Sequence, residues 1–462
     1  MPESQLVIRN GTVFRAGRRE RLDVAVTDGR IAGFGDAVRG KREIDATGCW
    51  VLPGVVDVHT HMALPVRGLR SSDDFGSGSI AAAFGGVTCI VDFSVSRPEM
   101  SLSESIESRC READVSAIDY SLHGEVVGMT PSRLDEFVEA CRLGVRSFKF
   151  YTTYSSSGRM TDDGMLLRSF RRLAELGARA VVHAENDGII LSLTEKLLMQ
   201  GRTSVTDLPS ARPDVCEAEA VARVCLLAQE AGAELRIAHL TSRKGLDQVE
   251  AARRHRVAHG GAPALWVETC PQYLLLDETA YEGPRGRCFA ATPPLRAARD
   301  REALWRGLVA GGIDLVATDH CPFRTAEKEE HERFVDLPYG LPGVETLLPL
   351  LVEEGVHAGR IPPERLVEVL CERPARALGL WPRKGRLAVG ADADIVVIDP
   401  SERRTIRADD LHMATDFSPY EDREVRGWPK TTIVRGKAVI ENGRFVGDAG
   451  WGEFVPQEPV AT

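Results

Sequence analysis

Eight short apolar segments alternate with helix-forming stretches through the middle of this chain, and this alternation constrains the fold more than any other feature. Strands of a parallel sheet are buried on both faces, so they read as continuous apolar runs followed by amphipathic helices. Helical patterns occur at 162–176, 217–231, 243–254 and 299–309. The repetition predicts an α/β fold, a (β/α)8 TIM barrel. The expected strands are 54–59, 87–92, 117–123, 146–150, 180–183, 235–239, 265–270 and 313–319.

Both ends of the chain differ from the middle, because short alternating apolar and polar runs are separated there by glycines. This pattern is typical of short strands and turns. Because it occurs at both ends, we expect one small β-sandwich domain built from both. The expected domains are 1–52 for the N-terminal part of the β-sandwich, 53–385 for the barrel, 386–445 for the C-terminal part of the β-sandwich, and 446–462 for an extended C-terminal tail.

The composition excludes several classes of protein. A net charge of -10 without a basic stripe argues against a nucleic-acid partner, whose phosphates need clustered lysine and arginine. The chain has no apolar run of about 18 residues and no signal-peptide pattern, so we expect no membrane partner. Its ten cysteines form no CxxC pair, which is typical of reduced thiols and predicts a cytoplasmic protein.

Metal-binding side chains follow several of the expected strands at the point where each strand ends. His59 and His61 end the first strand, and His183, His239 and Asp319 end later ones. The C-terminal strand ends of such a barrel converge on one mouth, where active sites lie. Alternate residues of a strand point the same way, so His59 and His61 face the same side. Four histidines and one aspartate together predict a site for Zn²⁺ or a similar ion.

Lys149 lies within an apolar strand, and its role has two interpretations. The lysine stem could pack in the core while the amine reaches outward to water. Alternatively, the amine could carry CO2 as a carbamate, an anion whose two oxygens could bridge two metal ions. The spacing of residues does not decide between these alternatives.

Several motifs together resemble the cyclic amidohydrolases, and within them the hydantoinase and dihydropyrimidinase branch. The similarity covers nearly the whole chain, including both β-rich ends. The motifs that carry it are His59-Thr60-His61, Phe148-Lys149-Phe150, His183-Ala184-Glu185-Asn186, Ala238-His239-Leu240-Thr241, Glu268-Thr269-Cys270-Pro271-Gln272-Tyr273-Leu274, Thr292-Pro293-Pro294-Leu295-Arg296 and Ala317-Thr318-Asp319-His320-Cys321-Pro322.

This resemblance implies two divalent metal ions per chain, with zinc the expected metal, and a homotetramer. It assigns one ion to His59, His61 and Asp319, and the more exposed ion to His183 and His239. Carboxylated Lys149 would bridge the two ions. Two metals about 3.5–4 Å apart generate hydroxide at neutral pH and polarise the target carbonyl.

The resemblance also assigns catalytic and substrate-binding roles. Asp319 would move the proton from the attacking hydroxide to the departing nitrogen, and Tyr154 would stabilise the oxyanion. Backbone groups near Thr292 and Tyr339 would hold the ring amide. The family often has asparagine where Tyr339 stands, which puts the fit of the substrate in doubt.

The segment after the first barrel strand predicts a pocket for a neutral ring. Residues 62–66 are apolar, so Ala63 and Leu64 could line the substrate together with Tyr151. We expect Arg67 and Arg70 on the solvent side of this segment. The expected reaction is the opening of a cyclic ureide, either a 5-substituted hydantoin or a dihydropyrimidine, to an N-carbamoyl amino acid.

Three alternative functions remain open at this point. Allantoinase is the nearest, because its substrate also contains a hydantoin ring. Dihydroorotase-like enzymes carry an arginine two residues after the HxH pair, where this chain has Ala63. The neuronal scaffold proteins of this fold have lost metal ligands, whereas all six ligand positions and Tyr154 are retained here.

Three further features receive structural interpretations. Cys270 is expected to be a structural thiol and not a nucleophile. Gly76 and Gly78 do not follow a strand, so they are not interpreted as a dinucleotide-binding loop. The charged run 327–333 is expected to be a solvated loop over the mouth of the barrel.

Overall fold

An eight-stranded sheet forms the centre of the protein in a computed structural model that describes residues 4–35, 39–258 and 264–460. The strands follow one another in chain order, and every neighbouring pair is parallel. A parallel bridge between Thr60 and His320 joins the first strand to the segment after the last, which closes the barrel. The strands are β8 Val55–Thr60, β11 Val87–Phe93, β12 Asp119–Glu125, β13 Ser147–Tyr151, β14 Arg179–His183, β15 Glu234–Ile237, β16 Leu265–Thr269 and β17 Leu315–Val316.

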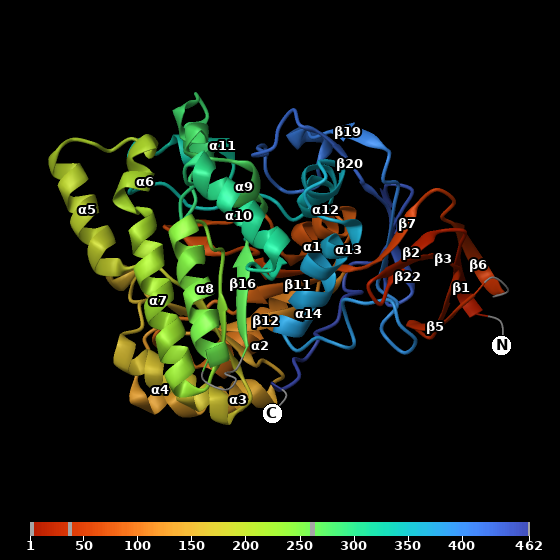
Figure 1. Cartoon of the computed structure of the whole chain (residues 1–462), viewed down its shortest axis with the longest axis horizontal. Helices are drawn as coiled ribbons and strands as arrows, with labels where there is room; N and C mark the ends of the chain where they lie inside the picture. Colours follow the sequence, from red (N-terminus) through yellow and green to blue (C-terminus); the bar gives the residue numbers. More distant parts are fainter. Residues whose placement is uncertain (1–3, 36–38, 259–263, 461–462) are drawn as a thin grey trace.

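Helices lie outside the barrel strands, as the alternating pattern predicts (Figure 1). Helix α4 (Asp163–Glu175) is amphipathic, because it buries Leu166, Phe170 and Leu173 at a spacing of three to four residues. Asp162 caps that helix by accepting a hydrogen bond from the Met165 backbone N–H. The helices are α1 Phe75–Phe84, α2 Leu102–Ala113, α3 Glu136–Arg142, α4 Asp163–Glu175, α5 Asp187–Met199, α6 Leu208–Ala211, α7 Asp214–Ala231, α8 Arg243–Ala258, α9 Pro271–Leu275, α10 Ala298–Ala310, α11 Thr325–Glu329, α12 Leu347–Leu351, α13 Pro363–Val367 and α14 Arg373–Ala377.

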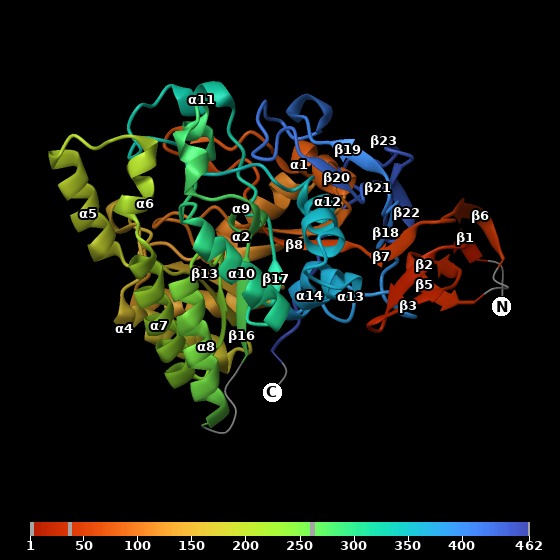
Figure 2. The same ribbon diagram turned by 45° about the horizontal axis from the view of Figure 1, so that its top comes forward.

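The two ends of the chain meet in a separate β region beside the barrel (Figure 2). One sheet has seven strands in the order β23-β22-β21-β18-β7-β2-β3, so it combines N-terminal and C-terminal segments. A four-stranded sheet, β5-β4-β1-β6, comes from the N-terminal end alone. These strands are β1 Ser4–Arg9, β2 Thr12–Arg15, β3 Arg18–Arg21, β4 Val24–Thr27, β5 Arg30–Phe34, β6 Gly40–Asp45, β7 Trp50–Pro53, β18 Ile395–Ile398, β21 Pro429–Val434, β22 Lys437–Glu441 and β23 Arg444–Phe445. The shared sheet supports the domain division expected from the sequence, which we retain as a proposal.

The tail after β23 runs across the base of its own barrel, where the strands begin. Backbone N–H groups of Val455, Gln457 and Val460 donate to the carbonyls of Tyr120, Gly144 and Gly177. The Gln457 side chain also donates to Ser121 and Leu122 near the start of β12. The described part of the tail is therefore bound within its own chain.

A buried lysine lies at the same base, where the barrel meets the β region. Lys384 is fully buried, and its ammonium binds Asp119 and lies 3.0 Å from Asp392 and 2.7 Å from Asp394. Arg435 also binds Asp119 and donates to the Trp451 carbonyl in the tail. These ion pairs connect the barrel, the C-terminal β strands and the tail.

No helix in the ranges that the structure describes is long and apolar enough to cross a membrane.

The last barrel strand is shorter than expected, since β17 covers only Leu315–Val316 of the expected 313–319. The residues after it form no regular strand, although His320 pairs with Thr60 in a parallel bridge, and this segment carries Asp319.

Candidate metal centre

A cavity of about 450 Å³ opens at the end of the barrel where the strands finish. All six of the side chains expected to bind metal line this one cavity, together with Tyr154, Thr292 and Tyr339. The six come from separate barrel segments: β8 and the residue after it, β13, β14, and the segments that follow β15 and β17. They are His59, His61, Lys149, His183, His239 and Asp319.

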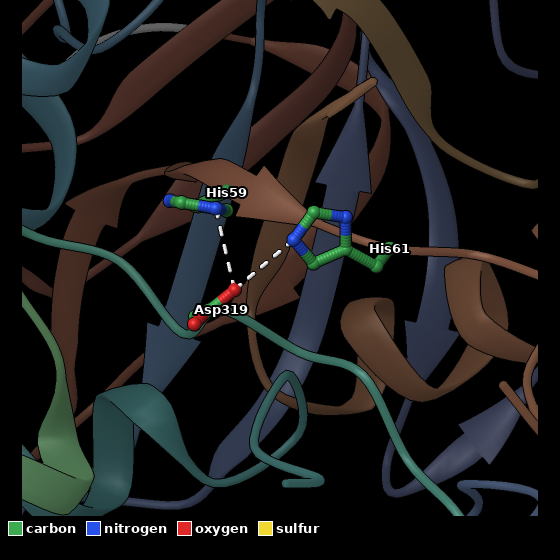
Figure 3. Close-up of side chains that lie close together, drawn as sticks. All are labelled: His59, His61 and Asp319. Atoms are coloured by element: carbon green, nitrogen blue, oxygen red, sulfur yellow. Dashed lines mark ion pairs between the residues drawn. The ribbon is translucent and has the colours of Figure 1, made fainter. Parts of the chain in front are cut away.

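His59, His61 and Asp319 form the tightest group at this mouth, and their ligand atoms all lie within 4.8 Å of one another. The Asp319 Oδ1 atom is 3.2 Å from His59 Nε2 and 3.1 Å from His61 Nε2 (Figure 3). Two imidazole nitrogens and a carboxylate oxygen that converge in this way are the donor set that a zinc-like ion prefers.

Glu268 on β16 orients His59. Its Oε1 atom lies 2.6 Å from His59 Nδ1 and accepts a hydrogen bond from the His239 backbone N–H at 3.1 Å. With Nδ1 bound to the carboxylate, Nε2 is left facing Asp319. A carboxylate behind a histidine fixes the tautomer and orientation of a metal ligand in many sites. Glu268 belongs to one of the motifs of the family resemblance, but no role was predicted for it. Its position near the end of an expected strand is the feature of the sequence that indicates a place at the barrel mouth.

Asp319 is held by the turn that follows β17. Asp57 accepts hydrogen bonds from the Thr318 backbone N–H and, at 2.5 Å, from the Thr318 hydroxyl, so the preceding residue is fixed from two directions. Asp319 itself has φ 54°, and His239 has φ 37°. Such left-handed backbone is uncommon for residues with a side chain and is concentrated at functional sites.

His183 and His239 form a second pair beside the first, with ring centroids 4.6 Å apart. His183 Nε2 lies 2.7 Å from Glu185, which is also bound by the Arg212 guanidinium. Burial lowers the pKa of His59, His183 and His239, so these imidazoles are neutral near pH 7. A neutral imidazole has the free lone pair that a metal ligand needs.

Lys149 is buried between the two pairs of histidines and faces aromatic rings. Its Nζ atom lies 5.2 Å from the Phe93 ring centroid and 5.6 Å from that of Tyr151. Burial lowers the pKa of Lys149 to about 8. This surrounding does not support an amine that reaches outward to water, because the whole residue is 2 % exposed.

The polar atoms around the site fit a group that carries positive charge. His61 Nδ1, His239 Nδ1 and Glu268 Oε2 are buried without a hydrogen-bond partner among the described residues. Buried polar atoms in native proteins are nearly always paired, so this concentration of unpaired atoms needs an explanation. Metal ions held by the surrounding histidines and carboxylates would supply the missing positive charge.

Tyr154 reaches the cavity from the segment after β13. Its hydroxyl lies 2.9 Å from the Thr292 hydroxyl, and its φ of 69° is again left-handed. The Arg212 guanidinium carbon lies 5.3 Å from the centre of the Tyr154 ring. Burial raises the pKa of Tyr154, so the phenol keeps its proton and can donate it in a hydrogen bond.

The wall of the cavity near β9 (Pro65–Val66) is apolar, as expected, but its composition differs from the prediction in one position. Leu64, Pro65 and Val66 line the cavity, as does Tyr151, whereas Ala63 is not among the described residues that do so. Ala63 has φ 45° and its backbone N–H donates to the Asp73 carbonyl. Ala63 is thus not part of this cavity wall, and its substrate contact stays a prediction.

Three arginines of the described residues line the cavity, and a position was predicted from the sequence only for Arg67. Arg67 is exposed at the rim, as expected, yet it also lines the cavity, where its guanidinium carbon lies 5.6 Å from the Tyr339 ring centre. Arg159 is paired with Glu125 and Arg212 with Glu185. Two of the three positive charges are therefore neutralised by buried carboxylates.

The charged run 327–333 contains a residue that contradicts its prediction as a solvated loop. Lys328 is 1 % exposed, because its side chain turns inward from α11 to backbone carbonyls. The neighbours Glu329 and Glu330 are exposed, as expected.

Cys270 is fully buried and burial raises its thiol pKa well above the ordinary value, in agreement with a structural thiol.

Comparison with known proteins identifies the family of this chain. Residues 50–439 match the model of the amidohydrolase family. D-phenylhydantoinase of Escherichia coli O9:H4 is 42% identical over 463 residues, covering 98% of each chain. The crystal structure of dihydropyrimidinase from Brevibacillus agri aligns with a TM-score of 0.95 at 35% identity over 99% of each chain. L-hydantoinase from Arthrobacter aurescens aligns with a TM-score of 0.90 at 31% identity, over 98% of this chain and 100% of its own. The chain therefore belongs to the amidohydrolase family and, within it, to the hydantoinase and dihydropyrimidinase branch.

Proposed function

We propose that this protein hydrolyses the ring amide of a cyclic ureide and releases an N-carbamoyl amino acid. The observation that carries the proposal is one cavity in which six metal-binding side chains meet Tyr154 and an apolar wall. The relatives are named for hydantoin and dihydropyrimidine hydrolysis, which are reactions of this type. A 5-substituted hydantoin or a dihydropyrimidine is thus the proposed substrate.

Two divalent ions, zinc in our proposal, would be held by the four histidines, Asp319 and a carboxylated Lys149. When bound, they supply a nucleophilic hydroxide at neutral pH and polarise the carbonyl under attack. The position of Lys149 between the histidine pairs supports its role as the bridging ligand. Its amine attacks CO2 to form an N–C bond and loses a proton, which gives a carbamate whose oxygens can reach both ions.

Asp319 is the proposed proton carrier. Its carboxylate would accept the proton of the attacking hydroxide and deliver it to the ring nitrogen when the C–N bond breaks. The fixed turn at Thr318 supports this role, because it holds the carboxylate close to His59 on β8 and to His61 just after this strand.

Tyr154 is the proposed donor to the oxyanion that forms at the attacked carbonyl. A preorganised donor of this kind typically contributes 10²–10³-fold to kcat. Thr292 and Tyr339 lie on two segments that line the same cavity, and we propose that their backbone groups hold the ring amide. The hydrogen bond between Thr292 and Tyr154 supports a shared task for the two residues.

The substituent on the ring would lie against Leu64, Pro65, Val66 and Tyr151. An apolar wall favours hydrogen, alkyl or aryl substituents and disfavours a carboxylate, which loses hydration without a partner. Because Arg67 lies at the rim, a long polar substituent could reach it, whereas a carboxylate attached directly to the ring could not be both buried and paired there.

A kinetic panel at one pH and one metal loading tests the proposed substrate. We expect much higher kcat/KM for dihydrouracil or a 5-alkyl or 5-aryl hydantoin than for dihydroorotate, with allantoin between them. Dihydroorotate as the best substrate would contradict the apolar-wall argument, and allantoin as the best would make the protein an allantoinase.

Metal analysis of the purified protein distinguishes an enzyme from a scaffold protein, because a scaffold that has lost its metal ligands is expected to bind no metal.

We also propose that the protein is a homo-oligomer, with the tetramer implied by the resemblance. Apolar side chains are exposed on α5 and α7, including Met199 at 76 % and Leu226 at 65 %. Exposed patches of this kind are typical of interfaces, and we propose that a second copy covers α5. Light scattering should give a multiple of the chain mass, and Leu198→Glu with Met199→Glu should lower it. A wild-type monomer would contradict this proposal.

A further inference from the structure

Lys328 is a buried lysine outside the proposed metal centre. It comes from α11, within a run that is otherwise charged and mostly exposed. Its Nζ atom donates to the backbone carbonyls of Cys288 at 3.0 Å, Ala290 at 2.9 Å and Gly340 at 2.6 Å. A buried amine that binds three carbonyls from two separate segments has a defined structural task.

The number of acceptors indicates the protonation state of this amine. An ammonium has three N–H donors, whereas a neutral amine has two. Burial lowers the pKa of Lys328 to about 7, but three carbonyl oxygens at hydrogen-bond distance favour the ammonium. The Phe323 ring, centred 5.9 Å from Nζ, adds a further favourable contact for a cation.

The two segments bound by Lys328 lead directly into the proposed substrate site. After Cys288 and Ala290 the chain continues into Ala291 and Thr292, which line the cavity. Gly340 lines the cavity itself, between Tyr339 and Leu341. Lys328 thus contacts both walls from behind, on the side away from the substrate.

Other contacts show that these walls form one unit around the lysine. The Gly340 backbone N–H donates to the same Ala290 carbonyl at 3.0 Å. Gly340 has φ 150°, and a Cβ added there would lie 2.3 Å from the Cys321 carbonyl oxygen. The backbone at Gly340 is therefore closely packed, and α11 is tied to the other segment as well, because Arg287 donates to the Glu329 carbonyl.

We propose that Lys328 is a positioning residue for the substrate ring, because it fixes the separation between the wall that carries Thr292 and the wall that carries Tyr339. The inference rests on the proposed function, in which these two walls hold the ring amide. A misplacement of about 1 Å in such a site can lower the rate about 10²-fold. Loss of the ammonium should therefore weaken substrate binding even though Lys328 never touches the substrate.

Lys328→Met tests this role, because it retains a chain of similar length without the N–H donors. We expect KM for the best cyclic ureide to rise at least about 10-fold and kcat/KM to fall about 10²-fold. Metal content should stay at the wild-type value. Lys328→Gln, which keeps two N–H donors, should give an intermediate KM and decides the test if the methionine variant does not fold.

Lys41→Met is the matched control, since Lys41 is an exposed lysine on β6 and should leave KM unchanged. Hydrogen exchange adds a readout that does not depend on turnover: segments 288–292 and 339–341 should both exchange faster in Lys328→Met. Folded variants with wild-type KM and unchanged exchange, even if they melt at lower temperature, would overturn the inference. Wild-type protein that opens no cyclic ureide contradicts the proposed function instead, while the exchange measurement still decides whether Lys328 couples the two walls.

Discussion

The two ends of the barrel each bury a lysine among acidic or histidine side chains, but the two sites differ in how completely their polar groups are paired. At the base, Lys384 binds three aspartates, and Arg435 completes the group. At the mouth, Lys149 faces aromatic rings, and His61 Nδ1 and His239 Nδ1 have no hydrogen-bond partner among the described residues, while Glu268 Oε2 lies 3.4 Å from the Arg236 guanidinium.

This difference in the pairing of polar groups distinguishes the cluster around Lys384, which we interpret as structural, from the groups around Lys149, which we propose to be functional. Asp119, Asp392 and Asp394 are close enough together to resemble a metal site, but the Lys384 ammonium already provides the cation. At the mouth the ligand atoms of His59, His61 and Asp319 converge, and Lys149, unlike Lys384, forms no ion pair with a carboxylate of the described residues. Charge clusters in a barrel therefore need to be judged by their unpaired atoms as well as by their residue types, in agreement with the placement of active sites at the C-terminal face and stability at the other.

Lys149→Ala is the change with the largest expected effect on the comparison. It removes the proposed bridging ligand, so we expect loss of bound metal and of measurable activity. Metal analysis and turnover of the best cyclic ureide check this outcome, and a short-chain acid added with metal should partly restore activity. If this variant keeps full metal occupancy and activity, Lys149 is not a metal ligand, and the proposed difference between Lys149 and Lys384 is contradicted.

Asp319→Asn tests proton transfer at the mouth. The amide keeps the size of the side chain but cannot accept the proton, so kcat should fall about 10²–10⁴-fold while metal remains bound. Tyr154→Phe should lower kcat by about 10²–10³-fold through the lost donor to the oxyanion. Near-wild-type turnover of Asp319→Asn would mean that another group carries the proton.

Lys384→Met tests the base. Removing one partner of a buried ion pair leaves uncompensated charge, so the free energy of unfolding should fall by about 3–5 kcal/mol. The kcat of the folded variant should be unchanged, because the cluster is at the opposite end from the cavity. Lys437→Met, at a half-buried lysine paired with exposed Asp448, is the control and should stay within about 0.5 kcal/mol. A reduced kcat in folded Lys384→Met would show that the two ends are coupled.

The pH dependence of this base cluster should appear around the pKa of Asp394. The three aspartates raise the pKa of Lys384 above its ordinary value despite burial, and Lys384 and Arg383 hold the pKa of Asp392 below its own. Burial raises the pKa of Asp394 to about 6, even with Lys384 beside it. A carboxyl whose folded-state pKa is raised lowers stability once it ionises, so the Lys384 ammonium matters most where Asp394 is charged. The loss of unfolding free energy in Lys384→Met, measured by urea unfolding, should therefore be larger at about pH 8 than at about pH 5. An equal loss at both pH values would contradict this coupling.

Periodicity was sufficient to predict the barrel, because apolar runs alternate with helical patterns through most of the middle of the chain. It was not sufficient to predict the end of the last strand, since β17 stops at Val316 and the chain turns to present Asp319. Local pattern also misplaced Lys328. A lysine between acidic neighbours indicates a solvated run, and only three distant carbonyls make its burial favourable.

The sequence by itself determined which residue types end each barrel strand, and therefore that histidines and an aspartate would meet at one mouth. The strand periodicity forces that convergence. Only the tertiary structure decided how those groups are oriented and paired, because partners such as Glu268 for His59, Asp57 for Thr318 and Glu185 for Arg212 are far apart in the chain. Hydrogen bonds and burial depend on separation in space, and a single sequence does not record that separation.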